Sequence, residues 1–342
     1  MTLEQVKLSL DTPQKIVITS HRNPDGDAIG SSLALYHFLQ SKGHSVNIVF
    51  PSLYPISFEW MPQIDRISIF DTQTDTCNSL LFLSDIIFVL DYNSLDRVDK
   101  MGDFIKTLKR QRKIMIDHHR EPDNFVDFML SDITASSTCE LVYDFILSIE
   151  GKKAITPTIA DFIYTGIVTD TGSFKFSTSP KLFRTVASLL ELGARDTFVQ
   201  DLIFNSLEEK NLRLLGHVLA NRMEILSEFK TGIVWLTKKD YEIFDIQRGD
   251  TEGIVNNVMM IRDIHLACFI TEQPTIVKLS LRSKGEFSVQ EFCRDHFNGG
   301  GHKNASGGYS NLHLRNTIDK IKALLPVYKD RIVNSYNVVV NE

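Results

Sequence analysis

Short apolar runs that end at histidine or aspartate are the feature of this sequence that most constrains its fold. In the first half of the chain, β-branched runs alternate with patterns typical of helices. The predicted strands cover residues 16–19, 46–50, 67–70, 86–90 and 113–116, with helices at 29–39 and 103–109. This order predicts a doubly wound α/β domain with a mostly parallel sheet.

After these elements the pattern predicts helices at residues 137–147, 158–168 and 181–192, then a long helical segment, charged on one face, at 199–229. New strand-like runs follow at 231–236, 265–271 and 275–281, before a helix at 289–296. At 342 residues the chain exceeds one typical hydrophobic core. We therefore expect a first domain at 1–195, a helical connector at 196–229 and a smaller α/β domain at 230–342.

The start of the predicted 137–147 helix allows two interpretations. Ser137 and Glu140 fit a capping box, in which both side chains satisfy exposed backbone amides. The same helix start also has the charge and free amides to face a phosphate.

We assign four acidic and histidine clusters to the ends of strand-like runs. Their members are His21 with Asp25 and Asp27, then Asp91, then Asp117 with His118 and His119, and finally Asp170. In an open parallel sheet, loops at the carboxyl ends of the strands converge on one site. An isolated aspartate there is usually a cap or turn residue, but the recurrence of such groups favours one shared centre.

These side chains suit a pair of divalent ions. Carboxylates alone favour magnesium or calcium, whereas added imidazole shifts the preference toward manganese, iron, cobalt or zinc. Two ions about 3.5–4 Å apart can polarise a phosphoryl oxygen and activate water for in-line attack. Asp91, alone at its strand end, is the candidate for the carboxylate that both ions share.

Composition narrows the range of ligands and compartments. The net charge of −6 disfavours attraction to a long nucleic acid duplex, so an anionic substrate should be small. The four cysteines are widely scattered, as expected of reduced thiols in a cytoplasmic protein. Neither a signal peptide nor an apolar run long enough to cross a bilayer is evident, so no membrane association is expected.

The tripeptide Asp117-His118-His119 after an apolar run, with His21-Arg22-Asn23-Pro24-Asp25-Gly26-Asp27 upstream, resembles the DHH phosphoesterases. The segment from Asn298 to Gly308 resembles the associated C-terminal domain of one branch. The resemblance implies two Mn²⁺ ions, with Mg²⁺ or Co²⁺ as substitutes. One ion would be held by His21, Asp25 and Asp91, and the other by Asp27, Asp91, His118 and Asp170. Among the catalytic residues, Asp91 would bridge the ions, His119 would face the scissile phosphate and Asp117 would orient a ligand.

The second domain carries the expected substrate-binding residues. Gly299, Gly300 and Gly301 permit either a flexible turn or a backbone cradle for an anion, to which His302 adds a donor. The resemblance favours the cradle and implies that Arg282 grips a terminal phosphate, since a guanidinium can bind that group through two hydrogen bonds.

The expected activity is hydrolysis of very short RNA to mononucleotides, together with dephosphorylation of 3'-phosphoadenosine 5'-phosphate. This expectation follows from the resemblance, the size of the chain and the lack of an extra nucleic-acid-binding module. One alternative is hydrolysis of linear dinucleotides from cyclic signalling molecules, or of polyphosphate or pyrophosphate. A metal-dependent nucleotide sensor without hydrolysis is a third, which the complete ligand set disfavours. The sequence leaves open whether the chain forms a homodimer.

Overall fold

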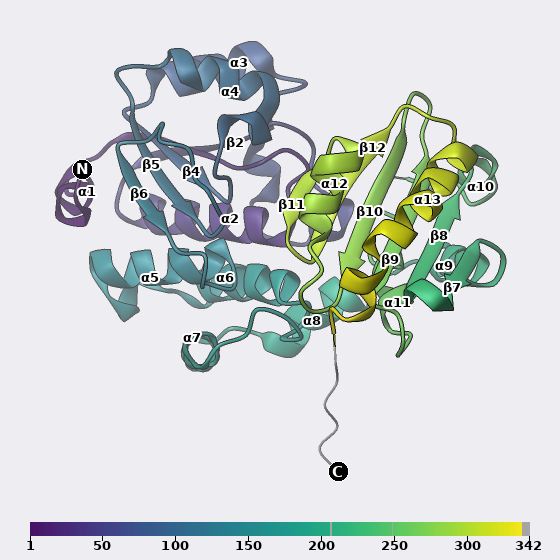
Figure 1. Cartoon of the computed structure of the whole chain (residues 1–342). Coiled ribbons are helices and arrows are strands. Elements are labelled where there is room, and N and C mark those ends of the chain that lie inside the picture. The colour runs from purple at the N-terminus through teal and green to yellow at the C-terminus, as the bar shows by residue number, and fades with distance from the viewer. Residues whose placement is uncertain (206, 248, 337–342) are drawn as a thin grey trace. The chain divides into compact units, whose positions relative to one another are not determined.

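The structure is a computed structural model that describes residues 1–205, 207–247 and 249–336. The chain divides into two compact units, Met1–Ser206 and Leu207–Glu342, and each is described by itself (Figure 1). The division falls inside the segment expected to connect the two domains. Within the described ranges, no helix is both long and apolar enough to span a bilayer.

The first unit is built on a six-stranded sheet in which every pair of neighbouring strands is parallel, in the order β3-β2-β1-β4-β5-β6. Its strands are β1 (Lys15–Thr19), β2 (Ser45–Phe50), β3 (Ile67–Ile69), β4 (Ile86–Leu90), β5 (Arg112–Asp117) and β6 (Phe128–Ser131). The predicted doubly wound parallel sheet is confirmed, although strand β6 was not predicted. Its four residues are only half-buried, so they lack the continuous apolar pattern of the central strands.

Helices cover both faces of this sheet (Figure 1). The helices of this unit are α1 (Leu3–Ser9), α2 (Gly26–Ser41), α3 (Thr74–Leu83), α4 (Asp99–Thr107), α5 (Thr138–Glu150), α6 (Pro157–Asp170), α7 (Pro180–Glu191) and α8 (Asp196–Phe204). Helices α7 and α8 pack against α6 rather than on the sheet. Ile16 and Ile18 of β1 pack in a core with α2, α5 and α6, whereas Val17 packs on the opposite face with α3 and α4. Strands covered on both faces read as continuous apolar runs, which is why the sequence revealed them.

The order of the strands determines where a site can form. Strands β1 and β4 are neighbours at the centre, and the chain proceeds from β1 toward one edge of the sheet and from β4 toward the other. The loops after the two strands therefore diverge, and in such sheets ligands bind at the carboxyl ends of these two strands. His21 follows β1 and Asp91 follows β4, so both residues lie at this switch in strand order.

The second unit contains a mixed six-stranded sheet in the order β11-β12-β10-β9-β8-β7, in which β8 and β9 are parallel and the other pairs are antiparallel. Its strands are β7 (Met223–Leu226), β8 (Thr231–Leu236), β9 (Leu266–Glu272), β10 (Val277–Ser283), β11 (Gly300–His302) and β12 (Ala305–Ser310). Its helices are α9 (Glu209–Asn221), α10 (Lys238–Ile243), α11 (Ile254–Met259), α12 (Val289–Phe297) and α13 (Leu314–Val333). The predicted second α/β fold is confirmed.

The prediction of one long helical segment at 199–229 was wrong. Helix α8 ends at Phe204, α9 begins at Glu209, and the segment then continues into strand β7. Strand β7 pairs with β8, so tertiary pairing overrides the helical pattern in this part of the chain.

Candidate metal centre

Asp91 lies at the centre of the histidine and carboxylate cluster. It follows β4 with a left-handed backbone (φ 63°), which aspartate tolerates better than most residues. Its amide donates to the Ile116 carbonyl on β5 over 3.1 Å, which fixes this turn. The side chain is 3% exposed; Oδ2 lies 3.2 Å from His21 Nε2 and Oδ1 lies 3.6 Å from His118 Nε2. The two carboxylate oxygens therefore face different histidines.

The first group of potential ligands consists of His21, Asp25 and Asp91. One ligand atom from each lies within 4.8 Å of the others. His21 Nδ1 is 2.9 Å from the Arg22 carbonyl oxygen, which directs Nε2 toward the carboxylates. Asp25 caps helix α2 by accepting from the amides of Asp27 and Ala28, and its Oδ1 lies 3.9 Å from His21 Nε2.

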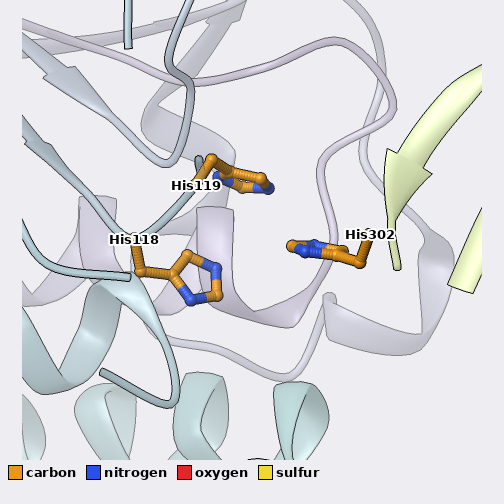
Figure 2. A group of neighbouring side chains, drawn as sticks. All are labelled: His118, His119 and His302. Atoms are coloured by element: carbon orange, nitrogen blue, oxygen red, sulfur yellow. The ribbon is translucent and has the colours of Figure 1, made fainter. Parts of the chain in front are cut away.

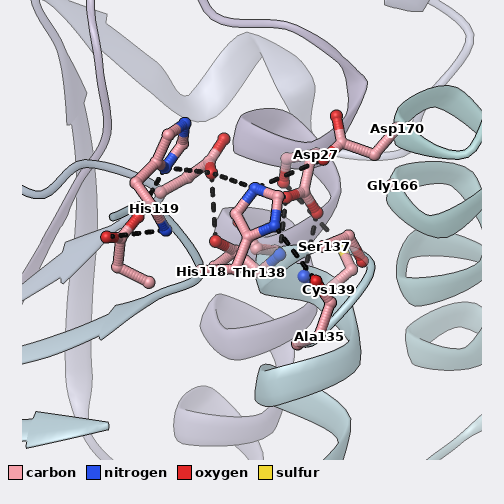
Figure 3. Close-up of polar contacts among 12 residues, drawn as sticks. Asp27, His118, His119, Ala135, Ser137, Thr138, Cys139, Gly166 and Asp170 are labelled. Atoms are coloured by element: carbon pink, nitrogen blue, oxygen red, sulfur yellow. Dashed lines mark hydrogen bonds and ion pairs between the residues drawn. The ribbon is translucent and has the colours of Figure 1, made fainter. Parts of the chain in front are cut away.

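The second group consists of Asp27, Asp91 and His118, again with ligand atoms within 4.8 Å of one another. His118 Nε2 lies 4.0 Å from Asp27 Oδ2 and 3.3 Å from Asp170 Oδ2 (Figure 3). The structure thus brings all six predicted metal ligands into one cluster. Placing Asp170 after a strand was wrong, because it is the last residue of helix α6.

Helix α5 begins against Asp27 (Figure 3). Asp27 Oδ2 accepts from the Thr138 amide over 2.6 Å, and Oδ1 accepts from the Cys139 amide over 2.8 Å. The alternative in which these amides face a phosphate is therefore wrong, because a carboxylate of the same chain occupies them. An acidic side chain at a helix N-terminus is stabilised by the helix dipole.

The predicted capping box at this helix is only half correct. Ser137 is the N-cap and its Oγ accepts from the Glu140 amide over 3.1 Å. The Glu140 carboxylate does not return to Ser137; it accepts from the amide and hydroxyl of Ser136, over 2.8 and 2.9 Å. The N-cap is confirmed, whereas the reciprocal contact is shifted by one residue.

The electrostatics of the cluster favour a bound cation. Burial, together with the negative charges of Asp91 and Asp25, raises the pKa of Asp27 well above its usual value, although two backbone amides oppose this rise. Burial and the charges of Asp27, Asp25 and Asp91 raise the pKa of Asp170 in the same way. These carboxylates crowd one buried space, and a bound cation would offset the repulsion between them.

Asp91 and His21 respond as an ion pair. Burial alone would raise the pKa of Asp91, but the hydrogen bond from His21 and the charges of the surrounding histidines hold it well below its usual value. Burial would lower the pKa of His21, but the hydrogen bond to Asp91 and the charge of Asp25 raise it. The mixed donors, their spacing and the excess of carboxylates fit two divalent ions that share Asp91.

His119 is held separately from the two ligand groups. Its Nδ1 lies 2.8 Å from Asp117 Oδ1, and its amide donates to Asp117 Oδ2 over 3.1 Å. Asp117 is fully buried, so it fixes the orientation of this imidazole rigidly. Figure 2 shows the rings of His118 and His119 beside each other after β5, with centroids 4.8 Å apart.

In the second unit, Arg282 and His302 lie in one row across the sheet. Ala305 of β12 is the direct cross-strand partner of both Arg282 on β10 and His302 on β11. Direct partners project from the same face of a sheet, so only the small Ala305 side chain separates them. Among the described residues no carboxylate shifts the pKa of Arg282, which burial alone lowers, and its guanidinium donates to the Leu281 carbonyl oxygen over 3.0 Å. Figure 2 also draws His302.

The glycines before His302 serve the β11–β12 hairpin. A Cβ at Gly299 would lie 2.0 Å from the Gly307 carbonyl oxygen, and Gly301 adopts φ +140°, which favours glycine. Gly300 has open space where its Cβ would be. Residues 300–302 form a strand rather than a flexible turn. The backbone cradle stays a prediction, with Gly300 as the position that packing does not constrain.

Thr138 is a residue of the site that the sequence reasoning did not single out. Besides its amide on Asp27, its Oγ1 donates to Asp91 Oδ1 over 3.0 Å. The polar run from Ser136 to Thr138 before an apolar helix is a signal of this role, but the same run also fits a simple helix cap.

A doubly wound parallel sheet with imidazoles and carboxylates gathered at its strand-order switch defines an α/β protein with a candidate two-metal centre. Residues 15–167 match the N-terminal domain of the DHH family, and residues 240–333 match the DHHA1 domain. The chain belongs to the DHH family of phosphoesterases, which are hydrolases.

Relatives match along most of their length. The chain is 28% identical to the bifunctional oligoribonuclease and PAP phosphatase NrnA of Bacillus subtilis, over 90% of this chain and 92% of that protein. It is 30% identical to the protein of the same name from Thermus thermophilus, over 85% and 83%. The crystal structure of an exopolyphosphatase-related protein from Bacteroides fragilis superimposes with a TM-score of 0.93 at 36% identity, over 96% and 97%.

Proposed function

We propose that this protein is a two-metal phosphoesterase that hydrolyses very short RNA to mononucleotides and dephosphorylates 3'-phosphoadenosine 5'-phosphate. The observation that carries the proposal is Asp91, whose two oxygens face His21 on one side and His118 on the other. The two relatives named as oligoribonucleases and PAP phosphatases support the substrate class.

Two divalent ions, with Mn²⁺ as the proposed pair, would polarise the phosphoryl group and lower the pKa of an attacking water. His21, Asp25 and Asp91 would hold one ion, and Asp27, Asp91, His118 and Asp170 the other. The side chain of Asp25 is 55% exposed, whereas those of His21 and Asp91 are buried. Asp25 is therefore the ligand nearest to solvent, on the side where a substrate can enter.

His119 would contact the phosphate rather than a metal. Asp117 Oδ1 lies 2.8 Å from His119 Nδ1 and holds the ring in one orientation. With a proton on Nε2, His119 would donate to a phosphoryl oxygen as negative charge develops in the transition state.

We also propose that Arg282 and His302 bind a phosphate of the substrate in the second unit. Arg282 presents a desolvated guanidinium that no described carboxylate neutralises, in the same cross-strand row as His302. The Gly299–His302 backbone would add amide donors to the same anion.

Polyphosphate hydrolysis is a second candidate, favoured by the similarity to the exopolyphosphatase-related protein. A long inorganic polyanion requires several uncompensated cations. Arg22, the arginine that directly follows His21, instead pairs with both Asp71 and Asp99, which neutralise it. This pairing favours short nucleotides over polyphosphate.

One assay compares these activities directly. Labelled RNAs of two to five nucleotides, a linear dinucleotide, 3'-phosphoadenosine 5'-phosphate, pyrophosphate and polyphosphate are incubated at fixed Mn²⁺, with a chelated sample as control. We expect the largest specificity constants for the shortest RNAs and the bisphosphate nucleotide. Equal hydrolysis with and without the chelator, or preference for polyphosphate, would contradict the proposal.

A further inference from the structure

Thr138 contacts two of the candidate metal ligands at once. Its backbone amide donates to Asp27 Oδ2 over 2.6 Å, and its side-chain Oγ1 donates to Asp91 Oδ1 over 3.0 Å. Thr138 is the first residue of helix α5, and it is fully buried. Its two hydrogen bonds therefore form in a region from which water is excluded, where they are stronger than at a surface.

The contact with Asp91 selects one orientation of that carboxylate. Each carboxylate oxygen can accept two hydrogen bonds or metal contacts. Thr138 occupies one acceptor position of Oδ1, while His118 Nε2 lies 3.6 Å from the same oxygen and His21 Nε2 lies 3.2 Å from Oδ2. The plane of the carboxylate is thereby fixed with one oxygen toward each histidine.

We propose that Thr138 is a positioning residue. It holds the Asp91 carboxylate in the bridging orientation and the Asp27 carboxylate beside it. The inference rests on the proposed function, because it assigns Thr138 a role in binding the ion pair. Without the hydroxyl, the Asp91 carboxylate could rotate about its terminal bond, which is a soft torsion. An ion between Asp27, Asp91 and His118 would then lose one well-placed ligand atom.

The backbone part of this arrangement does not depend on the side chain. The amides of Thr138 and Cys139 hold both oxygens of Asp27 whatever residue occupies position 138. A substitution at position 138 therefore removes the hydrogen bond from the hydroxyl to Asp91 and keeps the hydrogen bond from the amide to Asp27. Removing this one hydroxyl tests its effect on Asp91 alone.

The experiment compares Thr138→Val, which keeps the shape and removes the hydroxyl, with Thr138→Ser, which keeps the hydroxyl. Mn²⁺ is titrated into metal-free protein by calorimetry, and magnetic coupling between bound ions is followed by electron paramagnetic resonance. We expect Thr138→Val to bind one of the two ions about 10- to 100-fold more weakly and to lose the coupling, while Thr138→Ser resembles the wild type. Melting of the metal-free variants reports folding, and Thr138→Ala replaces Thr138→Val if that variant does not fold.

Each outcome is decisive. Wild-type affinity and coupling in Thr138→Val would overturn the proposal, as would equal losses in Thr138→Val and Thr138→Ser, because packing rather than the hydroxyl would then matter. A wild-type protein that binds no pair of Mn²⁺ ions would instead refute the proposed function.

Discussion

Replacing Asp91 by asparagine tests the shared carboxylate most directly. The substitution keeps the shape of a side chain that is 3% exposed and removes one negative charge between His21 and His118. In the metal-free protein this negative charge attracts the neighbouring imidazoles. It also repels the carboxylates of Asp27 and Asp170 and so raises their pKa values. These effects oppose each other, so we expect little change in metal-free stability.

The response to metal should change strongly. An ion at 100 times its Kd stabilises the folded state by about 2.7 kcal/mol. In a unit of roughly 200 residues this corresponds to a Tm increase of about 5 to 11 °C. We expect Mn²⁺ to give this increase in the wild type and to give little or none in Asp91→Asn. The loss of several kcal/mol of charge stabilisation should also lower kcat by about 1000-fold.

The matched control is Asp85→Asn, at the opposite end of the same strand. Asp85 Oδ2 accepts from the Lys15 amide over 2.9 Å, a role that an asparagine oxygen can retain. Scanning calorimetry with and without Mn²⁺ measures both variants. An Mn²⁺-dependent Tm increase in Asp91→Asn equal to that of the wild type would refute the assignment of Asp91 as the shared ligand.

Three further predictions concern the second unit. Arg282→Ala should lower kcat/KM for short nucleotides by about 10- to 100-fold and leave the Mn²⁺ content unchanged, whereas Lys278→Ala on the same strand should leave kcat/KM unchanged. Steady-state kinetics and metal analysis of both variants measure these effects. Burial would raise the pKa of Asp240, but hydrogen bonds from Arg222 and Thr237 hold this pKa below its usual value. The ionised carboxylate therefore stabilises the folded state at any pH above its unfolded pKa of about 3.9. The free energy of unfolding should fall as the pH drops below about 4. Asp240→Asn should remove that dependence and cost about 2–3 kcal/mol at neutral pH, as urea unfolding will measure; an unchanged acid profile would be inconsistent with this role. Gly299→Ala should lower the Tm, because its Cβ would collide with a carbonyl oxygen, whereas Gly300→Ala should not, and equal melting curves would contradict this packing.

Five of the six strands of the first unit, all but β6, and the residues that gather in the candidate metal centre could be predicted from the amino-acid sequence alone. Strands such as β4 are buried on both faces, so they must be apolar throughout, and this pattern is visible in one dimension. The ligands follow such strands because the carboxyl ends of parallel strands share one edge. The proximity of Asp117-His118-His119 to the segment from His21 to Asp27 therefore follows from their positions after predicted strands.

How these groups meet depends on tertiary packing. Asp170 joins them from the end of helix α6, and Asp27 lies against the start of helix α5. Both positions depend on packing between helices that are distant in sequence. Strands β7 and β11 are short, and β12 contains Gly307 and Gly308, which are unfavourable in strands, so the local pattern did not reveal them. The two contacts of Thr138 arise in the same way. The order of the strands and the packing of α5 place the first residue of this helix beside Asp27, which follows β1, and Asp91, which follows β4.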